Sequence, residues 1–142
     1  MALVKAFTDV VVDESLSTSI TAAQGLIIAK RSAEHPILLV TASSRRAEEL
    51  TDELSTYIGA QHIAHFPPWE TLPHERLSPK SDTIAARYKV LNEIATKKDL
   101  RVVVTSIRGF IQPINAALTS TKPITLELDK EISMETVIER LS

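Results

Sequence analysis

Apolar residues along this chain follow two different spacings, and the spacing predicts where strands and helices lie. Residues 36–42 form an almost continuous apolar run that is too short for a helix, so we predict a strand buried on both faces. Further strands are expected at 61–66 and, again buried, at 101–105. Residues 124–128 alternate apolar and polar side chains, which predicts a strand with one solvent-facing side.

Around these strands, apolar residues recur every three or four positions, as in helices with one buried face. The expected inner faces are Ala22, Leu26, Ala29 and Ala33; Ala47, Leu50, Leu54 and Tyr57 or Ile58; Ile84, Tyr88, Leu91 and Ala95; Ile107, Phe110, Ile111 and Ile114; and Met134, Val137, Ile138 and Leu141.

The predicted helices also carry boundary signals. Three of them begin near residues that can cap an amino terminus, namely Ser43 or Ser44, Ser81 or Asp82, and Ser106. Gly59 is suited to end the second helix. Pro113 lacks a backbone N–H group, so the helix after Ser106 should be short or kinked.

Strands that alternate with helices over short connections imply βαβ units with right-handed crossovers. We therefore predict an α/β fold, a parallel sheet with flanking helices. The last helix has an apolar stripe and no later element to pack on, so we expect the chain to be the front of a longer protein.

Composition narrows the function. A chain of 142 residues with 44% hydrophobic residues can form one domain with a genuine core. Its formal charge of −2 gives no overall attraction to nucleic acid. Bases outnumber acids over residues 76–108 and acids predominate over 123–142, so a phosphate contact would be expected in the middle of the chain.

The chain contains no cysteine, which excludes disulfides and thiolate metal sites and fits a reducing cytoplasm. No apolar run approaches the length of a membrane span, and the amino terminus lacks a signal-peptide pattern. We therefore expect a cytoplasmic protein.

Two stretches resemble parts of nucleotide sites. Residues 10–14, VVVDE, imitate the strand and acid that hold magnesium in ATPases, but no phosphate loop precedes them, so a short strand ending at a turn is the simpler prediction. Residues 16–33 contain one glycine, Gly25, which Leu26 follows instead of lysine. A phosphate cradle needs several glycines and a lysine, so we expect no nucleotide cofactor here.

Other candidate sites are weaker still. No serine lies in a glycine-flanked elbow after a strand, so no nucleophilic triad is predicted. His62 and His65 would point to opposite faces of a strand, which does not favour a metal pair. Arg45 and Arg46 at a helix start oppose its dipole unless they meet an anion or an acidic neighbour, and two exposed arginines are the simpler interpretation. No catalytic residue is predicted.

The most distinctive stretch is FPPWETLPHERLSPKSDTIAARYKVL, residues 66–91. Prolines make its first half a stiff loop around the single tryptophan, Trp69, and this loop runs directly into a helix. The loop could be a rigid connector whose tryptophan fills a hydrophobic gap, or a functional surface. We predict that Trp69 is buried against the core or against the following helix.

This stretch resembles the segment around Trp-Glu-Thr-Leu-Pro in the bacterial transcription-repair coupling factor (Mfd) family, within its N-terminal module similar to the excision nuclease subunit UvrB. Residues 36–54 and 101–114 resemble the elements on either side. The family motif, with an expected structural or interdomain role, falls on Trp69, Glu70, Thr71, Leu72, Pro73, Glu75, Arg76, Ser78, Pro79 and Asp82.

The resemblance implies a domain plan. Residues 1–15 would be an N-terminal extension, residues 16–122 a degenerate form of the RecA-like first lobe of helicases, and residues 123–142 the start of a second, smaller domain. The missing phosphate loop would make the lobe non-catalytic.

The resemblance also implies a function. The whole family protein would be an ATP-dependent DNA translocase that displaces stalled RNA polymerase and recruits UvrA for nucleotide excision repair. Polymerase and DNA contacts would lie in downstream domains, and UvrA contacts mainly in the domain after this segment. The segment would then be a scaffold or regulatory module whose partners are the other domains of the same protein. The alternative is a free-standing α/β ligand-binding domain or enzyme that uses the loop at 67–79.

Overall fold

The computed structural model describes residues 21–71, 78–97, 99–114, 128 and 131–141. The expected N-terminal extension and nearly all of the strand expected at 124–128 lie outside the described residues.

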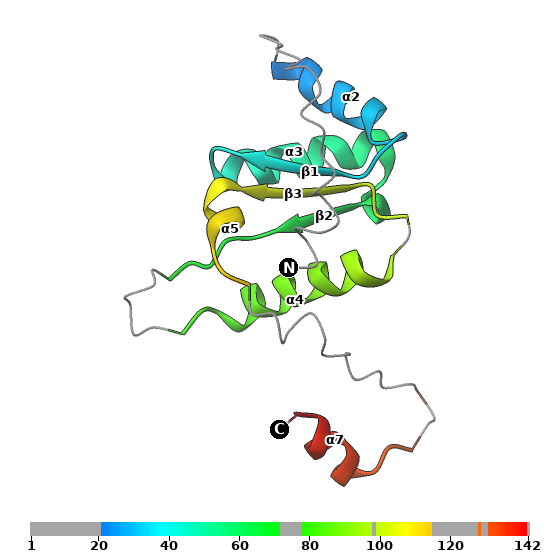
Figure 1. Ribbon diagram of the computed structural model, residues 1–142, viewed down its shortest axis with the longest axis vertical. Coiled ribbons are helices and arrows are strands. Elements are labelled where there is room, and N and C mark those ends of the chain that lie inside the picture. Colours follow the sequence, from blue (N-terminus) through cyan, green and yellow to red (C-terminus); the bar gives the residue numbers. More distant parts are fainter. Residues whose placement is uncertain (1–20, 72–77, 98, 115–127, 129–130, 142) are drawn as a thin grey trace.

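Three parallel strands form the sheet, in the order β1-β3-β2 (Figure 1). They are β1 (Ile37–Thr41), β2 (Ile63–Phe66) and β3 (Val102–Ser106). Every residue of the central strand β3 is buried, as predicted. For β1 the prediction holds in part, because Ile37 and Leu39 pack on one core cluster and Leu38 on the other. These residues are only partly buried and Val40 is 38% exposed, since β1 is an edge strand of the described sheet.

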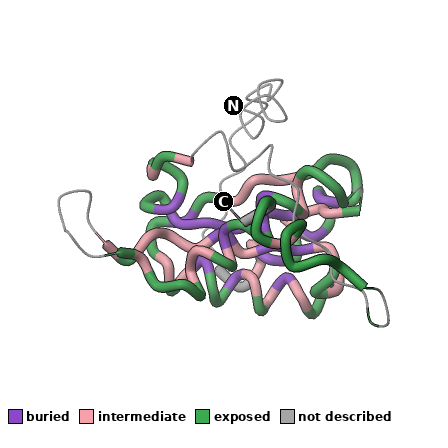
Figure 2. Tube along the Cα trace, turned by 90° about the horizontal axis from the view of Figure 1, so that it is seen from below, coloured by how far each residue is buried: buried purple, intermediate pink, exposed green. Residues whose placement is uncertain are grey.

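Helices cover both faces of this sheet, which confirms the α/β prediction. Helices α2 (Thr21–Arg31) and α3 (Ser44–Ile58) pack on one face, where Ala29 and Leu54 meet Val102 and Val104. Figure 2 shows the buried positions gathered in the middle of the folded part.

The other face of the sheet is covered by α4 (Ser81–Thr96). Its residues Val90 and Leu91 pack against Phe66 and Val103. Alternate residues of each strand thus feed two separate core clusters, as the pleat of a sheet requires.

Two of the predicted N-terminal helix caps are confirmed, and so is the predicted end of the second helix. The Ser43 hydroxyl accepts a hydrogen bond from the Arg46 N–H at 3.2 Å, and Gly59 ends α3 with φ of 85°. The Ser106 hydroxyl accepts from the Gly109 N–H at 3.3 Å and begins α5 (Ile107–Ile111), which is short as predicted.

The predicted cap of α4 was wrong. Lys80 occupies the N-cap position and makes no side-chain cap hydrogen bond, while Ser81 is already helical. Asp82 lies in the first turn, where its negative charge interacts favourably with the helix dipole.

The inner face of α3 was predicted correctly at Ala47, Leu50 and Leu54. At its last turn, Ile58 packs on the core and Tyr57 is exposed.

The inner face of α2 agrees with the prediction at Ala29 but not at Leu26. Ala29 is buried, whereas Leu26 is 58% exposed and Gly25 is buried instead. Ala33 lies beyond the helix, where Ser32 is the buried residue. Small residues face inward because α2 packs closely against α3.

In α4, Arg87 takes the inward position that was predicted for Tyr88. Tyr88 and Ala95 are exposed. The predicted inner face of α5 was also wrong, since Ile107, Phe110 and Ile111 are exposed and Gly109 is buried instead.

The last helix, α7 (Met134–Leu141), lies apart from the sheet in Figure 1. Met134 is 74% exposed and Ile138 is also exposed, as the predicted apolar stripe implies. Within the described part of the chain, no helix is long and apolar enough to cross a membrane.

Candidate functional site

The tryptophan loop leaves the sheet at the carboxyl end of β2, where it is held by the end of β3 and by α5. The Thr105 hydroxyl donates a hydrogen bond to the Phe66 carbonyl at 2.8 Å. Gly109 lies beside the loop, because a Cβ atom there would come 2.6 Å from the Thr105 hydroxyl oxygen and 3.4 Å from the Phe66 oxygen and the Pro68 nitrogen. The start of the loop is therefore held by Thr105 and lies against Gly109.

Arg87 of α4 lies between two aromatic rings at the centre of this site. Its guanidinium carbon is 4.1 Å from the ring centroid of Phe66 and 4.1 Å from that of Trp69. Its Nη1 atom donates a hydrogen bond to the Pro67 carbonyl at 2.8 Å. Arg87 is 2% exposed, so one side chain joins α4, the end of β2 and the tryptophan.

No carboxylate is among the described contacts of Arg87, so other groups must stabilise its charge. Burial lowers the pKa of Arg87 to about 10, so the side chain is still protonated at neutral pH. Its buried Nη2 atom has no hydrogen-bond partner among the described residues. A desolvated cation over an aromatic face gains about 2 kcal/mol, which makes the two rings the main compensation for burying this charge.

The backbone of Trp69 is held by the residue that follows α5. Its N–H donates to Gln112 Oε1 at 2.6 Å, and Gln112 Nε2 donates to the Trp69 carbonyl at 3.3 Å. The Trp69 side chain is half-buried, so the prediction of a buried tryptophan holds for its contact with α4 but not for its full burial.

Glu70 connects the loop to α4 and to α5 through hydrogen bonds. Its carbonyl accepts a hydrogen bond from Arg108 Nη2 at 3.1 Å, and its carboxylate accepts one from the Thr83 hydroxyl in the first turn of α4. The Thr83 hydroxyl is the main reason that the pKa of Glu70 is lowered. Both helices thus position the loop.

The structure places only part of the predicted motif. Trp69, Glu70 and Thr71 lie together in the loop, and the residues at the other end of the motif are Ser78, Pro79 and Asp82, at the entrance to α4. The remaining predicted residues lie outside the described part: Leu72, Pro73, Glu75 and Arg76.

Sequence reasoning missed the residues that hold the loop, which are Phe66, Thr83, Arg87, Arg108 and Gln112. One of them carried a usable signal. Arg87 follows Ile84 by three positions and precedes Leu91 by four, so helical periodicity places it on the inner face of α4.

Arg45 and Arg46 meet an acidic neighbour. Arg45 Nε lies 3.0 Å and Arg46 Nη1 3.4 Å from the Glu49 carboxylate. These hydrogen bonds lower the pKa of Glu49, and they compensate for two arginines at a helix amino terminus.

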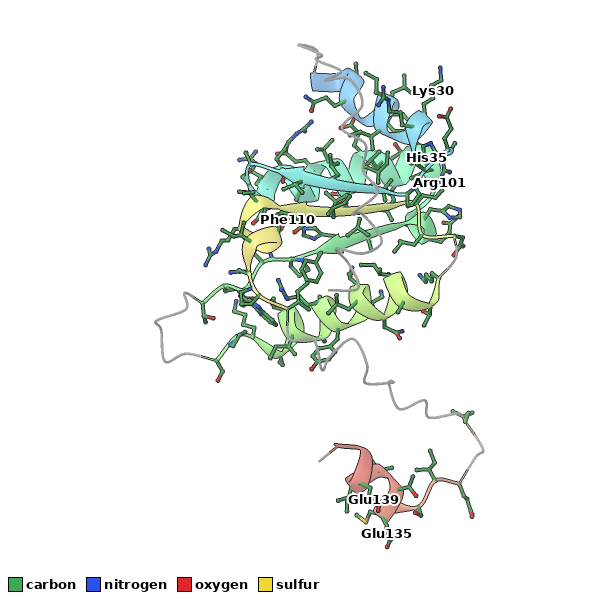
Figure 3. All side chains as sticks on the ribbon, in the orientation of Figure 1. Lys30, His35, Arg101, Phe110, Glu135 and Glu139 are labelled. Carbon is green, nitrogen blue, oxygen red and sulfur yellow. The ribbon has the colours of Figure 1, made fainter. Side chains whose placement is uncertain are left out.

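Within the described ranges, no three His, Asp or Glu residues are grouped so that they could hold a metal. A cavity of about 360 Å³ lies at the opposite end of the sheet, where β1 and β3 begin, and it is lined by residues that include His35, Lys97 and Arg101. Figure 3 shows His35 and Arg101 at that end of the sheet and Phe110 of α5 at the opposite end, so this cavity is remote from the loop.

No protein-family model matches the chain. The transcription-repair-coupling factor of Mycobacterium tuberculosis is 38% identical to it over 135 residues, a match that covers 91% of this chain and 11% of the relative. This chain is homologous to one segment of the transcription-repair-coupling factors. The corresponding protein of Mycobacterium bovis matches equally, and that of Escherichia coli K12 is 31% identical over 105 residues, covering 72% of this chain and 8% of the relative. The chain therefore spans a small part of the length of the coupling factors that it matches.

Proposed function

We propose that this chain acts as the UvrB-like scaffold segment of a transcription-repair coupling factor, a RecA-like lobe without catalytic function. The observation that carries the proposal is how the motif loop is held. Arg87 and Thr83 of α4 contact Trp69 and Glu70. Arg108 of α5 binds Glu70, and Gln112, which follows α5, binds Trp69. A loop in which the Trp69 backbone and the Glu70 carbonyl and carboxylate are hydrogen-bonded internally fits a rigid support better than a ligand site, which disfavours the alternative of a free-standing enzyme.

The position of Gly25 supports a non-catalytic role. Gly25 lies inside α2, and a Cβ atom there would meet the carboxylate end of Glu53 on α3. A glycine inside a helix is not available to a loop that wraps phosphates.

The proposal extends to the whole protein. A longer chain would contain a second domain beginning near residue 123, which recruits UvrA, and downstream domains that use ATP to move on DNA and displace stalled RNA polymerase. In that arrangement the segment at 16–122 would hold the neighbouring domains in position and would not bind nucleotide. Its direct partners would be those neighbouring domains.

Calorimetry with magnesium and ATP tests the non-catalytic role. We expect no saturable binding at protein concentrations that detect a dissociation constant of about 100 μM, roughly −5.5 kcal/mol. Saturable binding tighter than this would overturn the proposal. Purified UvrA should likewise be captured weakly or not at all by the 142-residue chain, and tight specific capture would place the UvrA interface inside this segment.

A further inference from the structure

The cavity at the amino ends of β1 and β3 has an apolar wall and a cationic side. It lies between the connection that follows α2, the end of α4 and the start of β3, and its volume is about 360 Å³. The large apolar residues that line it are Ile37, Ile94, Leu100 and Val103. Pockets of about 300 to 1,000 Å³ with a mostly apolar lining and a few polar groups are typical of small-molecule sites.

Arg101 is fixed at this cavity by the end of α2. Its Nε atom donates a hydrogen bond to the Ser32 carbonyl at 3.0 Å, and its Nη2 atom donates to the Ala29 carbonyl at 3.3 Å. These bonds leave the Nη1 atom without a hydrogen-bond partner in the described part of the chain. A guanidinium that is already held in place loses little conformational freedom when it binds an anion, so Arg101 is pre-organised for one.

The charges around the cavity are also unbalanced in favour of an anion. Lys97 lines the cavity together with Arg101, and its Nζ atom lies 2.9 Å from the Glu93 carboxylate. Glu34 is the one carboxylate among the described lining residues, and it is exposed, so water screens its charge. Arg101 is partly buried and has no ion pair with a described carboxylate. Its charge is therefore available to a ligand.

The surroundings favour a small molecule over a protein partner. A stable protein interface buries about 800 Å² on each side and has an apolar centre. Here the large apolar lining residues are buried or half-buried inside the cavity, and the exposed ones next to them are polar: Glu34, His35 and Lys97. Apolar contact is thus offered only to a group that enters the cavity.

We propose that this cavity binds a small organic carboxylate with an apolar body. The carboxylate accepts a hydrogen bond from Arg101 Nη1 and is attracted by Lys97, while the apolar body packs against Ile94 and Leu100. The site lies at the end of the sheet opposite the Trp69 loop, so it is independent of the proposed scaffold role.

An NMR titration of the full chain with 2-naphthoate tests the site. We expect saturable shifts of the amide signals of Ala33, His35 and Arg101 at concentrations up to about 5 mM, with the Trp69 amide unchanged. The neutral isostere 2-naphthalenemethanol should bind at least about tenfold more weakly, because it cannot form a charged hydrogen bond. Absence of saturable shifts, shifts confined to other regions, or equal binding of the alcohol would overturn the proposal.

Three variants separate the roles of the cations. Arg101→Gln should raise the dissociation constant of 2-naphthoate at least about tenfold, provided that its urea midpoint shows a folded chain. Lys97→Gln, at an exposed position, should raise it about threefold, as a solvent-exposed charge pair does. Lys89→Gln is the matched control, because Lys89 is exposed on α4 and does not line the cavity, and it should change nothing. Equal affinity in Lys97→Gln and Lys89→Gln would contradict the proposed site even if Arg101→Gln unfolds.

Discussion

Arg87 is a buried cation whose described partners are two aromatic rings and one carbonyl oxygen. Lysine could not reproduce this contact, because only the planar guanidinium stacks on both rings while one nitrogen donates to Pro67. The tryptophan is thus held by a residue from the following helix, and the loop and helix behave as one unit.

A double-mutant cycle measures this contact. Trp69→Ala and Arg87→Met should each lower the free energy of unfolding by about 2 kcal/mol, and the double variant should lose less than the sum because of a coupling of about 1 kcal/mol. Lys89→Ala is a control, since Lys89 is an exposed residue of α4 and surface substitutions there change the free energy of unfolding little. If Trp69→Ala unfolds at the same urea midpoint as the parent, the tryptophan is a binding surface instead.

His65 gives the fold a dependence on pH. Burial lowers the pKa of His65, against a smaller opposing effect of Glu48 and Asp52, and its Nε2 atom is buried without a hydrogen-bond partner among the described residues. The unfolded chain therefore binds a proton more readily, so the free energy of unfolding should fall as the pH is lowered through about 6.5. Urea unfolding at pH 8 and pH 5.5 measures this loss. The same loss in His65→Gln would assign it to other groups.

The presence of each helix could be predicted more reliably than the set of residues that it turns toward the core. Periodicity located α3 and its inner face because Ala47, Leu50 and Leu54 leave no competing stripe. In α2 and α4 the apolar residues nearly encircle the helix, and close packing selected Gly25 in α2 and the stacked Arg87 in α4 for the inside. The size of the side chain and its contacts with aromatic rings decide which residue of such a helix faces inward. The pattern of hydrophobic residues carries no information about either.

Gly109 in α5 tests how tightly this short helix clamps the loop. A Cβ atom there would lie 2.6 Å from the Thr105 hydroxyl, which would have to leave the Phe66 carbonyl. Gly109→Ala should therefore lower the free energy of unfolding by about 1 to 3 kcal/mol. Gly25→Ala is the matched control: it meets only the flexible end of Glu53 and gains helix propensity, so it should be neutral or stabilising by up to about 1 kcal/mol. Equal effects of the two variants would show that α5 does not clamp the loop.

For the whole molecule, the alternation of strands and helices was enough to predict a parallel α/β fold. The site could be predicted only as a location, the loop that begins at Trp69. Its supporting residues Gln112 and Arg108 lie far along the chain and reach the loop only because β2 and β3 are neighbours in the sheet. No local spacing in the sequence encodes that juxtaposition.

We propose that this segment supports a coupling factor without supplying its chemistry. The direct test replaces the matching segment of the Mycobacterium tuberculosis transcription-repair-coupling factor, 38% identical over 135 residues, with this chain and measures capture of UvrA by the purified chimera. We predict capture at the level of the unmodified coupling factor, and a marked loss when the chimera carries Trp69→Ala and Arg87→Met. A chimera that folds like its parent but captures no UvrA would contradict the proposed scaffold role.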